Sequence, residues 1–268
     1  MITASIVLYN TKNDYVKRII ASYQPSSERE LYIIDNSEMK TGHFEEIENV
    51  YYIFVGTNIG YGAAHNIAMK IAVQKKSEYH IVLNPDIVFE SHVIDELKKY
   101  ADENLDVVYM LPKVLYPNGE LQYLCKLLPT PFDLIFRRFL PQRGFIKKRN
   151  DRYILKDSGY NKIMNPPCLS GCFMFLRTKT IDEYELLFDE RFFMYCEDFD
   201  LIRRLHRVGK TIFYPKINII HDHARSSYKS KKMLVQHIVS ACIYFNKYGW
   251  LIDDERIKMN RDILESLQ

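Results

Sequence analysis

The stretch His80-Ile81-Val82-Leu83-Asn84-Pro85-Asp86 is a short apolar run that stops at a polar turn. The run predicts a buried strand, and Pro85 cannot continue regular strand pairing. Asp86 is therefore placed just beyond the strand, as an acidic side chain on a turn. Open sheets of parallel strands bind their ligands at the carboxyl ends of the strands, so this turn is the first place to look for function.

The segments that precede this stretch alternate between strand-like and helix-like patterns. Apolar runs at 4–8, 31–34 and 51–55 are separated by amphipathic or Ala-rich segments at 14–21 and 63–73. Short apolar strands separated by helices predict an α/β fold with a parallel, doubly wound sheet. The polar residues that follow the strands should then share one edge of that sheet. They are Tyr9 and Asn10, Asp35 and Asn36, Asn58 and Gly60, and Asn84 and Asp86.

The second half of the chain adds a strand at 172–176, a helix that begins near Glu197 and a helical segment over 229–248. Apolar residues recur every third position between Phe199 and Val208, which turns one face of that helix inward. We predict one catalytic domain over residues 1–225 and a C-terminal helical extension over 226–268.

Composition restricts the kind of protein. Hydrophobic residues make up 47% and charged residues 26% of the 268 residues, as in an ordinary globular protein. No run approaches the roughly 18 apolar residues that cross a bilayer, and the first residues lack a signal-peptide pattern, so we expect a cytoplasmic protein. The five cysteines lack zinc-site spacing, and a net charge of +3 argues against nucleic-acid binding.

Asp86 is a candidate metal ligand. Mg²⁺ and Mn²⁺ commonly use one or two protein carboxylates, because substrate phosphates and waters complete their octahedron. A carboxylate in this position can equally cap the turn. His221 follows the apolar run 217–220 and is a second candidate ligand, although a lone histidine is more often structural.

Two other strand-end segments are candidates for nucleotide binding. Asp35 can accept the imide N–H of a uracil or thymine ring, or can cap its own turn. The segment Asn58 to Gly62 leads into a helix, so its small residues can let the backbone approach a nucleotide. The segment matches neither the dinucleotide fingerprint nor the P-loop.

The segment from Phe188 to Asp200 is the densest acidic and aromatic part of the chain. Attack of an acceptor hydroxyl on an anomeric carbon needs one carboxylate as a base, and Asp198 is the candidate. Asp198 and Glu197 can instead be acids that favour a helix N-terminus. Arg204 can steady a diphosphate, or can pair with Asp200 four residues earlier.

Several of these segments occur in one order along the chain, and in that order they resemble family 2 of the inverting glycosyltransferases, especially bacterial rhamnosyltransferases of surface polysaccharide synthesis. The resemblance spans most of the chain. The matching segments are 6–10, Asp35-Asn36-Ser37, 58–62 with Asn66, Leu83-Asn84-Pro85-Asp86, 170–177, 188–200, and His221 with Ser226 or Ser227.

The resemblance implies a GT-A fold, which is Rossmann-like with a mostly parallel central sheet flanked by helices. It also implies that Asp35 lies at the pyrimidine, Asp86 on Mg²⁺ or Mn²⁺, His221 in the same metal shell, and Asp198 as the base. Asn84 stands where the general family pattern has an aspartate, as in many rhamnosyltransferase-like members. We expect the sugar nucleotide to contact Tyr9, Asn10, Asp35, Asn58, Gly60, Asn84, Asp86, Gly171, Glu197 and Arg204.

The implied donor is dTDP-L-rhamnose, with a UDP-hexose as the alternative. The basic aromatic stretch 131–153 carries seven basic residues and two acidic ones, so it can lie on an anionic membrane or form a loop over the site. Membrane contact suits an acceptor saccharide on a polyprenyl diphosphate at the inner face of the cell membrane. The alternatives are a nucleotidyltransferase and a catalytically idle protein that binds membranes or polyanions.

Overall fold

The computed structural model describes residues 1–268 apart from 43, 45, 137–139, 142 and 223–230. Ser226, Ser227, Arg137, Arg138 and the predicted boundary at 225/226 therefore lie outside the described residues. The strands are β1 (Ile2–Leu8), β2 (Arg29–Asp35), β3 (Val50–Phe54), β4 (Tyr79–Leu83), β5 (Ile87–Val88), β6 (Val107–Leu115), β7 (Phe173–Arg177) and β8 (Lys210–His221).

Helices connect and flank these strands. They are α1 (Asn13–Tyr23), α2 (Tyr61–Gln74), α3 (His92–Glu103), α4 (Gly144–Tyr153), α5 (Thr178–Glu183), α6 (Glu197–Val208), α7 (Lys231–Tyr248) and α8 (Asp254–Ser266), with a π-helical turn η1 (Phe132–Phe136) and a 3₁₀ turn η3 (Lys156–Ser158). The described parts of the basic stretch 131–153 include η1 and α4.

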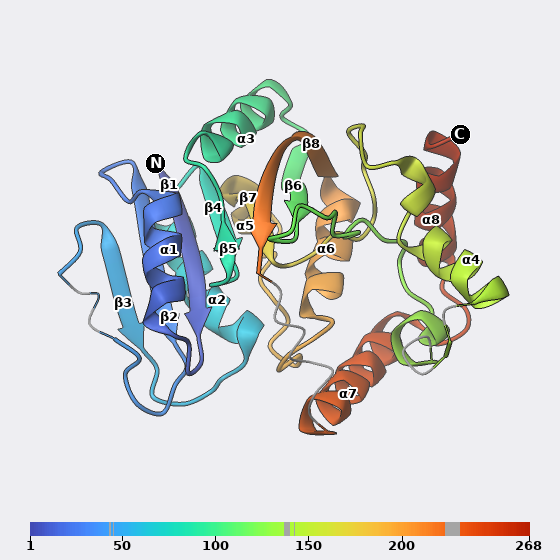
Figure 1. The fold of residues 1–268 in the computed structure, drawn as a ribbon, viewed down its shortest axis with the longest axis horizontal. Helices are drawn as coiled ribbons and strands as arrows, with labels where there is room; N and C mark the ends of the chain where they lie inside the picture. The colour runs from blue at the N-terminus through green and yellow to red at the C-terminus, as the bar shows by residue number, and fades with distance from the viewer. Residues whose placement is uncertain (43, 45, 137–139, 142, 223–230) are drawn as a thin grey trace.

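The strands form one eight-stranded sheet in the order β3-β2-β1-β4-β7-β6-β8-β5. The neighbours β3, β2, β1 and β4 are parallel throughout, and β6 is parallel to β8, whereas β7 and β5 run antiparallel to their neighbours. Helix α1 lies in front of the sheet and α2 behind it (Figure 1). The α/β architecture with a largely parallel sheet is confirmed.

Strand direction brings distant segments to one edge of the sheet. Leu8 pairs with Asp35 in the register of β1 and β2, and Leu83 pairs with Phe173 at the start of antiparallel β7. Ile87 of β5 pairs with His221 at the end of β8. The carboxyl ends of β1, β2, β4 and β8 and the start of β7 therefore meet at the same edge.

The C-terminal helices pack against the body of the protein through a small apolar cluster. Phe192 and Cys196, which precede α6, contact Ala241, Tyr244 and Phe245 of α7 in this buried cluster. The segment that leads into α6 is therefore held between the sheet and α7 (Figure 1). Within the described residues, no helix is both long and apolar enough to span a membrane.

Candidate active site

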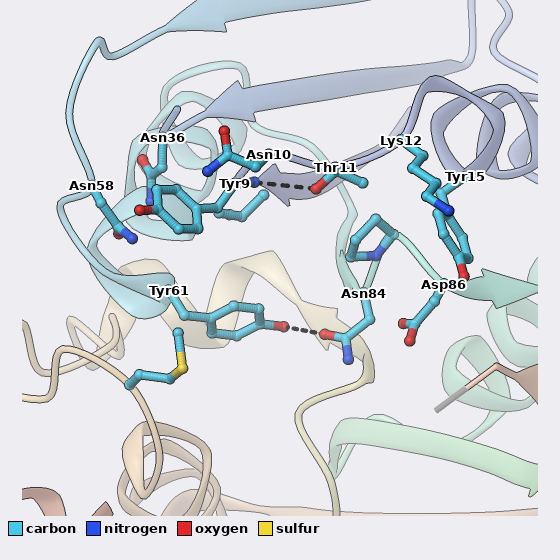
Figure 2. A pocket seen from close by; sticks show the side chains of 13 residues that line it. Tyr9, Asn10, Thr11, Lys12, Tyr15, Asn36, Asn58, Tyr61, Asn84 and Asp86 are labelled. Atoms are coloured by element: carbon cyan, nitrogen blue, oxygen red, sulfur yellow. Dashed lines mark hydrogen bonds between the residues drawn. The ribbon is translucent and has the colours of Figure 1, made fainter. Parts of the chain in front are cut away.

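A cavity of about 600 Å³ opens at the carboxyl edge of β1 and β4. Figure 2 shows its polar side chains, which follow β1, β2, β3 and β4 or lie at the starts of α1 and α2. The lining residues are Val7, Tyr9, Asn10, Thr11, Lys12, Tyr15, Asn36, Asn58, Tyr61, Asn84, Pro85, Asp86 and Met194. The structure therefore brings together five of the predicted nucleotide-site residues: Tyr9, Asn10, Asn58, Asn84 and Asp86.

The Asn84-Pro85-Asp86 turn is fixed by backbone contacts on both sides. The Asn84 N–H donates to the Cys172 carbonyl at 2.8 Å, and the Ile87 N–H donates back to the Asn84 carbonyl at 3.3 Å. Asp86 Oδ1 then lies 3.3 Å from His221 Nε2. The turn and the end of β8 thus place one carboxylate and one imidazole side by side.

Gln122 orients His221 from behind. Its side-chain N–H donates to the His221 carbonyl at 2.9 Å, and its Oε1 lies 3.1 Å from His221 Nδ1, so Nδ1 carries a proton and Nε2 faces Asp86. Burial lowers the pKa of His221, but Cys172 and Asp86 outweigh burial and raise that pKa to about 10. His221 therefore carries a proton on Nε2 near neutral pH, and a cation that binds Nε2 would replace that proton.

Asp86 and His221 also fit a divalent cation. Two neighbouring ligands at about 2.1 Å in an octahedral shell lie about 3.0 Å apart, close to the 3.3 Å between Oδ1 and Nε2. In the part of the chain that the structure describes, no group of three or more His, Cys, Asp or Glu side chains could hold a metal. A cation here would take two protein ligands, and substrate phosphates and waters would supply the others.

Tyr61 connects the Asn84 turn to the candidate base. Its hydroxyl lies 2.9 Å from Asn84 Oδ1 (Figure 2) and 3.0 Å from the Gly171 carbonyl. The Gly171 N–H in turn donates to Asp198 Oδ2 at 3.2 Å, and the Phe199 N–H donates to Asp198 Oδ1 at 2.8 Å. Two hydrogen bonds, one on each side of Gly171, therefore connect Asp198 to Tyr61 of the cavity wall.

Gly171 lets Asp198 approach this closely. A Cβ atom at position 171 would lie 2.9 Å from the Cβ of Asp198, which is too short for two carbon atoms. Gly60 has a similar role elsewhere, because its φ is +96° and an added Cβ would meet the Phe193 carbonyl at 2.6 Å. Neither glycine lines the cavity, so their contribution is close packing of backbone behind it.

The backbone just before Asp198 is strained. Tyr195 and Cys196 have φ values of 68° and 63°, so two consecutive non-glycine residues adopt the left-handed conformation, at about 1–2 kcal/mol each. Such strain persists only where the surrounding packing enforces it, and Cys196 lies in the buried cluster with α7. The strained turn starts α6 with Glu197 and Asp198 in its first turn.

Glu197 is buried beside Asp198, and its Oε2 has no hydrogen-bond partner among the described residues. Burial and then the negative charge of Asp198 raise the pKa of Glu197 to about 8. Its side chain does not line the cavity. A carboxyl that keeps its proton near neutral pH can donate a hydrogen bond where its ionised neighbour can only accept one.

This raised pKa predicts a pH-dependent stability. The folded protein keeps the Glu197 proton up to about pH 8, whereas the unfolded chain loses it near 4.5, so stability is lost as the pH rises between these values. We therefore expect Glu197→Gln to gain stability relative to wild type between pH 5 and pH 8. Urea unfolding of both proteins at the two pH values measures the difference, with exposed Glu28→Gln as the control. A difference that stays constant with pH contradicts the prediction.

The structure does not bring Asp35 and Arg204 to the cavity. The Asp35 carboxylate is buried and accepts hydrogen bonds from the Ser37 N–H, the Thr41 N–H and the Tyr52 hydroxyl. Burial raises the pKa of Asp35, but these hydrogen bonds outweigh it and hold the pKa below its ordinary value. Arg204 pairs with Asp200 at 2.9 Å and donates to the Leu187 carbonyl, which is the helical ion pair that the spacing allowed.

Two other residues on the cavity wall have polar side chains of the kind that sequence reasoning assigned to Asp35 and Arg204. Asn36 lines the cavity next to Asp35; its side-chain N–H donates to the Gly60 carbonyl, and its Oδ1 has no partner among the described residues. Lys12 supplies a cation on the wall at the start of α1. The position of Lys12 shortly after the first strand could have indicated that it lines the cavity. The position of Tyr61 within the 58–62 segment could have indicated the same for Tyr61.

No protein-family model matches the chain. The chain is 27% identical over 242 residues to rhamnosyltransferase WbbL of Escherichia coli K12, across 84% of this chain and 86% of WbbL. It is 24% identical to the N-acetylglucosaminyl-diphospho-decaprenol L-rhamnosyltransferase of Mycobacterium tuberculosis H37Rv, across 80% of this chain and 73% of that enzyme. The fold is similar to the solved structure of S. aureus TarS 1-349 with UDP, with a TM-score of 0.59 and 15% sequence identity. The match covers 98% of this chain and 70% of the TarS chain.

The fold and the similar proteins together define a glycosyltransferase with a GT-A-like fold. Within that class, the chain is similar in kind to bacterial rhamnosyltransferases, which confirms the resemblance found in its motifs. This assignment favours sugar transfer over nucleotidyl transfer and over a catalytically idle binding protein.

Proposed function

We propose that the protein transfers a sugar, L-rhamnose from dTDP-L-rhamnose, with inversion to a saccharide hydroxyl on a polyprenyl diphosphate carrier during bacterial surface polysaccharide synthesis. The names of the two curated relatives support rhamnose as the sugar, and the mycobacterial name supports a lipid-diphosphate-linked saccharide as the acceptor. A solved TarS complex with UDP-GlcNAc supports a nucleotide sugar as the donor class and keeps a UDP-hexose as the alternative.

The arrangement around Tyr61 carries this proposal. Its hydroxyl lies against Asn84 of the diphosphate-side turn and against the Gly171 carbonyl, while the Gly171 N–H holds Asp198. A single side chain thus spans the space between a candidate diphosphate site and a candidate base. This spacing suits one displacement step, in which the acceptor attacks on the face of the sugar opposite the leaving diphosphate.

Each end of the cavity has a part in this reaction. Asn36, Asn58 and Tyr9 would surround the nucleotide base and ribose, and Asn36 Oδ1 could accept the imide N–H in place of Asp35. Lys12 and Asn10 would face the diphosphate. Asp198 would take the proton of the acceptor hydroxyl as the new bond forms.

Asp86 and His221 would hold Mg²⁺ or Mn²⁺ at the diphosphate. A cation bound there neutralises charge that develops on the departing nucleoside diphosphate. Asn84 is a neutral side chain in the same turn, and its amide is already engaged by Tyr61. Asp86 is then the one carboxylate of the triplet that is available to the cation.

Thermal unfolding with a panel of sugar nucleotides tests the donor and the metal. We expect dTDP-L-rhamnose with Mn²⁺ to stabilise the folded protein, by about 2.7 kcal/mol at a hundredfold excess over Kd, and UDP-hexoses to stabilise it less. Asp86→Asn should lose the part of this shift that depends on Mn²⁺, while exposed Asp95→Asn on α3 should keep it. A larger shift with a UDP-hexose assigns the other donor, and no shift with any sugar nucleotide contradicts the proposed function.

A further inference from the structure

Exposed apolar side chains are concentrated in one part of the fold. Among the described residues, 19 large hydrophobic side chains are exposed, and nine of these lie between residues 140 and 145 or between 235 and 257. Leu251 and Ile252 are the most exposed of the nine, at 85% and 80%. Both lie on the loop between α7 and α8, so they project from the protein without neighbours to cover them.

The outer side of α7 continues this apolar surface. Val235 and Val239 are exposed and lie four residues apart, and Asn246 lies a further seven residues along, which places all three on one side of the helix. Trp250 donates from its indole N–H to Asn246 Oδ1 at 2.8 Å. The exposed side of α7 therefore leads through Trp250 directly to Leu251 and Ile252.

Unpaired cations lie next to this loop on α4. Phe145, Lys148 and Arg152 are exposed and follow the i, i+3, i+7 spacing of one helix face. Lys148 and Arg152 form no ion pair with any residue that the structure describes, whereas Lys147 pairs with Asp151 and Arg149 with Asp133. The same three side chains line a cavity of about 280 Å³ together with Leu127, Leu128 and Asn260.

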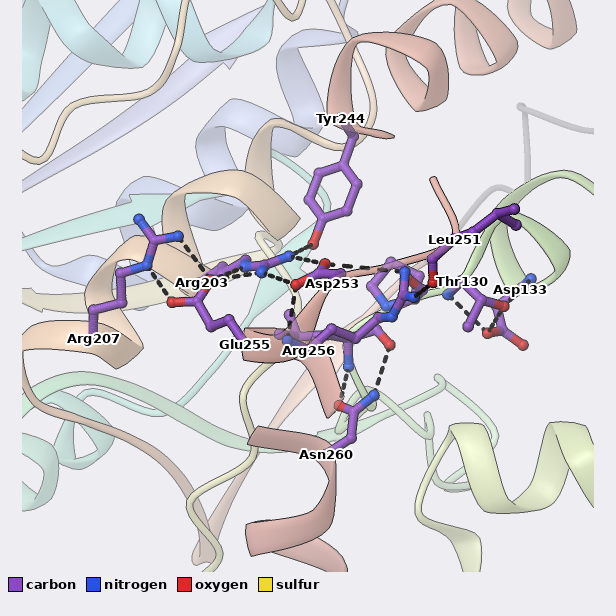
Figure 3. Close-up of polar contacts among 12 residues, drawn as sticks. Thr130, Asp133, Arg203, Arg207, Tyr244, Leu251, Asp253, Glu255, Arg256 and Asn260 are labelled. Carbon is purple, nitrogen blue, oxygen red and sulfur yellow. Dashed lines mark hydrogen bonds and ion pairs between the residues drawn. The ribbon is translucent and has the colours of Figure 1, made fainter. Parts of the chain in front are cut away.

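Arg256 joins the loop to the segment that carries α4. Its guanidinium donates to the Leu251 carbonyl at 3.0 Å and to the Pro129 carbonyl at 3.4 Å. Thr130 and Asp133, which follow Pro129, hold Arg149 of α4. Figure 3 shows Leu251 beside Thr130 and Asp133, with Arg256 next to them. The apolar loop and the cationic helix face are therefore parts of one continuous surface.

We propose that this surface, the docking face, binds an anionic lipid bilayer. The docking face consists of Trp250, Leu251 and Ile252 of the loop and Phe145, Lys148 and Arg152 of α4. The loop side chains would enter the boundary between head groups and acyl chains, and the two cations would contact anionic head groups. A bilayer is the proposed partner because exposed cations lie beside exposed apolar side chains, which is the pattern of interfacial binding.

Charge favours a bilayer over a second copy of the chain. A two-fold dimer uses the same patch on both copies, so it would turn Lys148 and Arg152 of one copy towards the same cations of the other. An anionic bilayer instead offers a negative surface over the whole patch. Docking does not depend on the identity of the donor sugar. The inference that docking brings the candidate active site to a lipid-linked acceptor rests on the proposed function.

Vesicle co-sedimentation of the full chain tests this docking face. We expect binding to vesicles of phosphatidylcholine with phosphatidylglycerol, and weaker binding to phosphatidylcholine alone. Leu251→Asp with Ile252→Asp should reduce binding by about tenfold or more at low and at high salt, because two apolar side chains no longer enter the bilayer. Lys148→Glu with Arg152→Glu should reduce binding by about tenfold or more at low salt and little at high salt.

Matched variants keep this test specific. Leu105→Asp changes a side chain that is 78% exposed beyond α3, and Lys17→Glu with Lys99→Glu changes two exposed lysines on α1 and α3, so both should bind like wild type. Equal losses in these controls, or no preference of the wild type for anionic vesicles, would overturn the proposal. So would light scattering that shows a dimer which the loop variant dissociates while vesicle binding persists.

The same variants separate docking from donor binding. Loop and α4 variants that lose vesicle binding but keep the sugar-nucleotide shift in thermal unfolding support docking as a separate property. Wild-type vesicle binding without any sugar-nucleotide shift contradicts the proposed function and leaves the docking face standing. A sugar-nucleotide shift in a wild type that binds no vesicles contradicts docking alone.

Discussion

Asp198→Asn is expected to lower the rate of sugar transfer by about 10²–10⁴-fold while the protein remains folded. The asparagine keeps the size of the side chain but cannot take a proton from the acceptor hydroxyl. Its amide can accept only one of the two N–H groups, from Gly171 and Phe199, that the carboxylate now accepts. Release of the nucleoside diphosphate in the presence of a saccharide acceptor measures the rate, and thermal unfolding checks the fold.

A second acid in the same segment provides the control. Asp189 pairs with Arg191 and Lys247 and does not line the cavity, so Asp189→Asn should transfer sugar at the wild-type rate. Donor binding should survive in Asp198→Asn, because no predicted contact to the nucleotide is removed. Wild-type turnover in folded Asp198→Asn would remove Asp198 from the mechanism and direct attention to Glu197.

The second large effect concerns stability and arises from a buried charge cluster around Arg203. This side chain of α6 is 1% exposed and donates to both oxygens of Asp253, at 2.6 and 2.8 Å. It also donates to Glu255 at 2.7 Å (Figure 3). Its guanidinium lies 4.0 Å from the centre of the Tyr248 ring. The helix that starts with the candidate base is thus joined to the end of α7 and to the start of α8.

Arg203→Met is expected to lower the free energy of unfolding by about 3–5 kcal/mol, because Asp253 stays buried without its guanidinium partner. Arg207→Met is the matched control. Arg207 also pairs with Glu255, but its side chain is 43% exposed, so its loss should cost only about 0–1 kcal/mol. Urea unfolding of the two variants and the wild type gives both differences.

A second substitution tests whether the buried charge causes the loss. Asp253→Asn removes the charge and keeps an oxygen for the Arg256 N–H, which Asp253 caps at 2.9 Å. Asp253→Asn added to Arg203→Met should therefore recover part of the stability. If Arg203→Met costs no more than Arg207→Met, the cluster does not hold the C-terminal helices to α6.

The positions of Tyr9, Asn10, Asn58, Asn84 and Asp86 at one cavity could be predicted from the sequence. They follow the short apolar strands β1, β3 and β4, which with β2 form four consecutive parallel strands, so the ends of these strands meet at one edge. The helix of Glu197 and Asp198 could be predicted as well, from its apolar spacing. These features depend on local periodicity and on one general rule of sheet topology.

The inward turn of Asp35 could not be predicted in the same way. A carboxylate after a strand can face a ligand or its own backbone, and the choice depends on whether donors stand within reach. Tyr52 reaches Asp35 only because β2 and β3 pair in a particular register. The Asp35 side chain is 0% exposed, so its carboxylate accepts three internal hydrogen bonds and does not face a ligand.

The sequence by itself determined the α/β alternation, the polar edge of the sheet and the resemblance to rhamnosyltransferases. Only the tertiary structure decided that Tyr61 lies against Gly171, that Gly171 holds Asp198, and that Arg203 locks the C-terminal helices to α6. The first of these contacts joins residues 110 positions apart and the third joins residues 50 apart. Local patterns set which face of an element is buried, whereas contacts at such separations depend on how whole elements pack, and no local pattern records that.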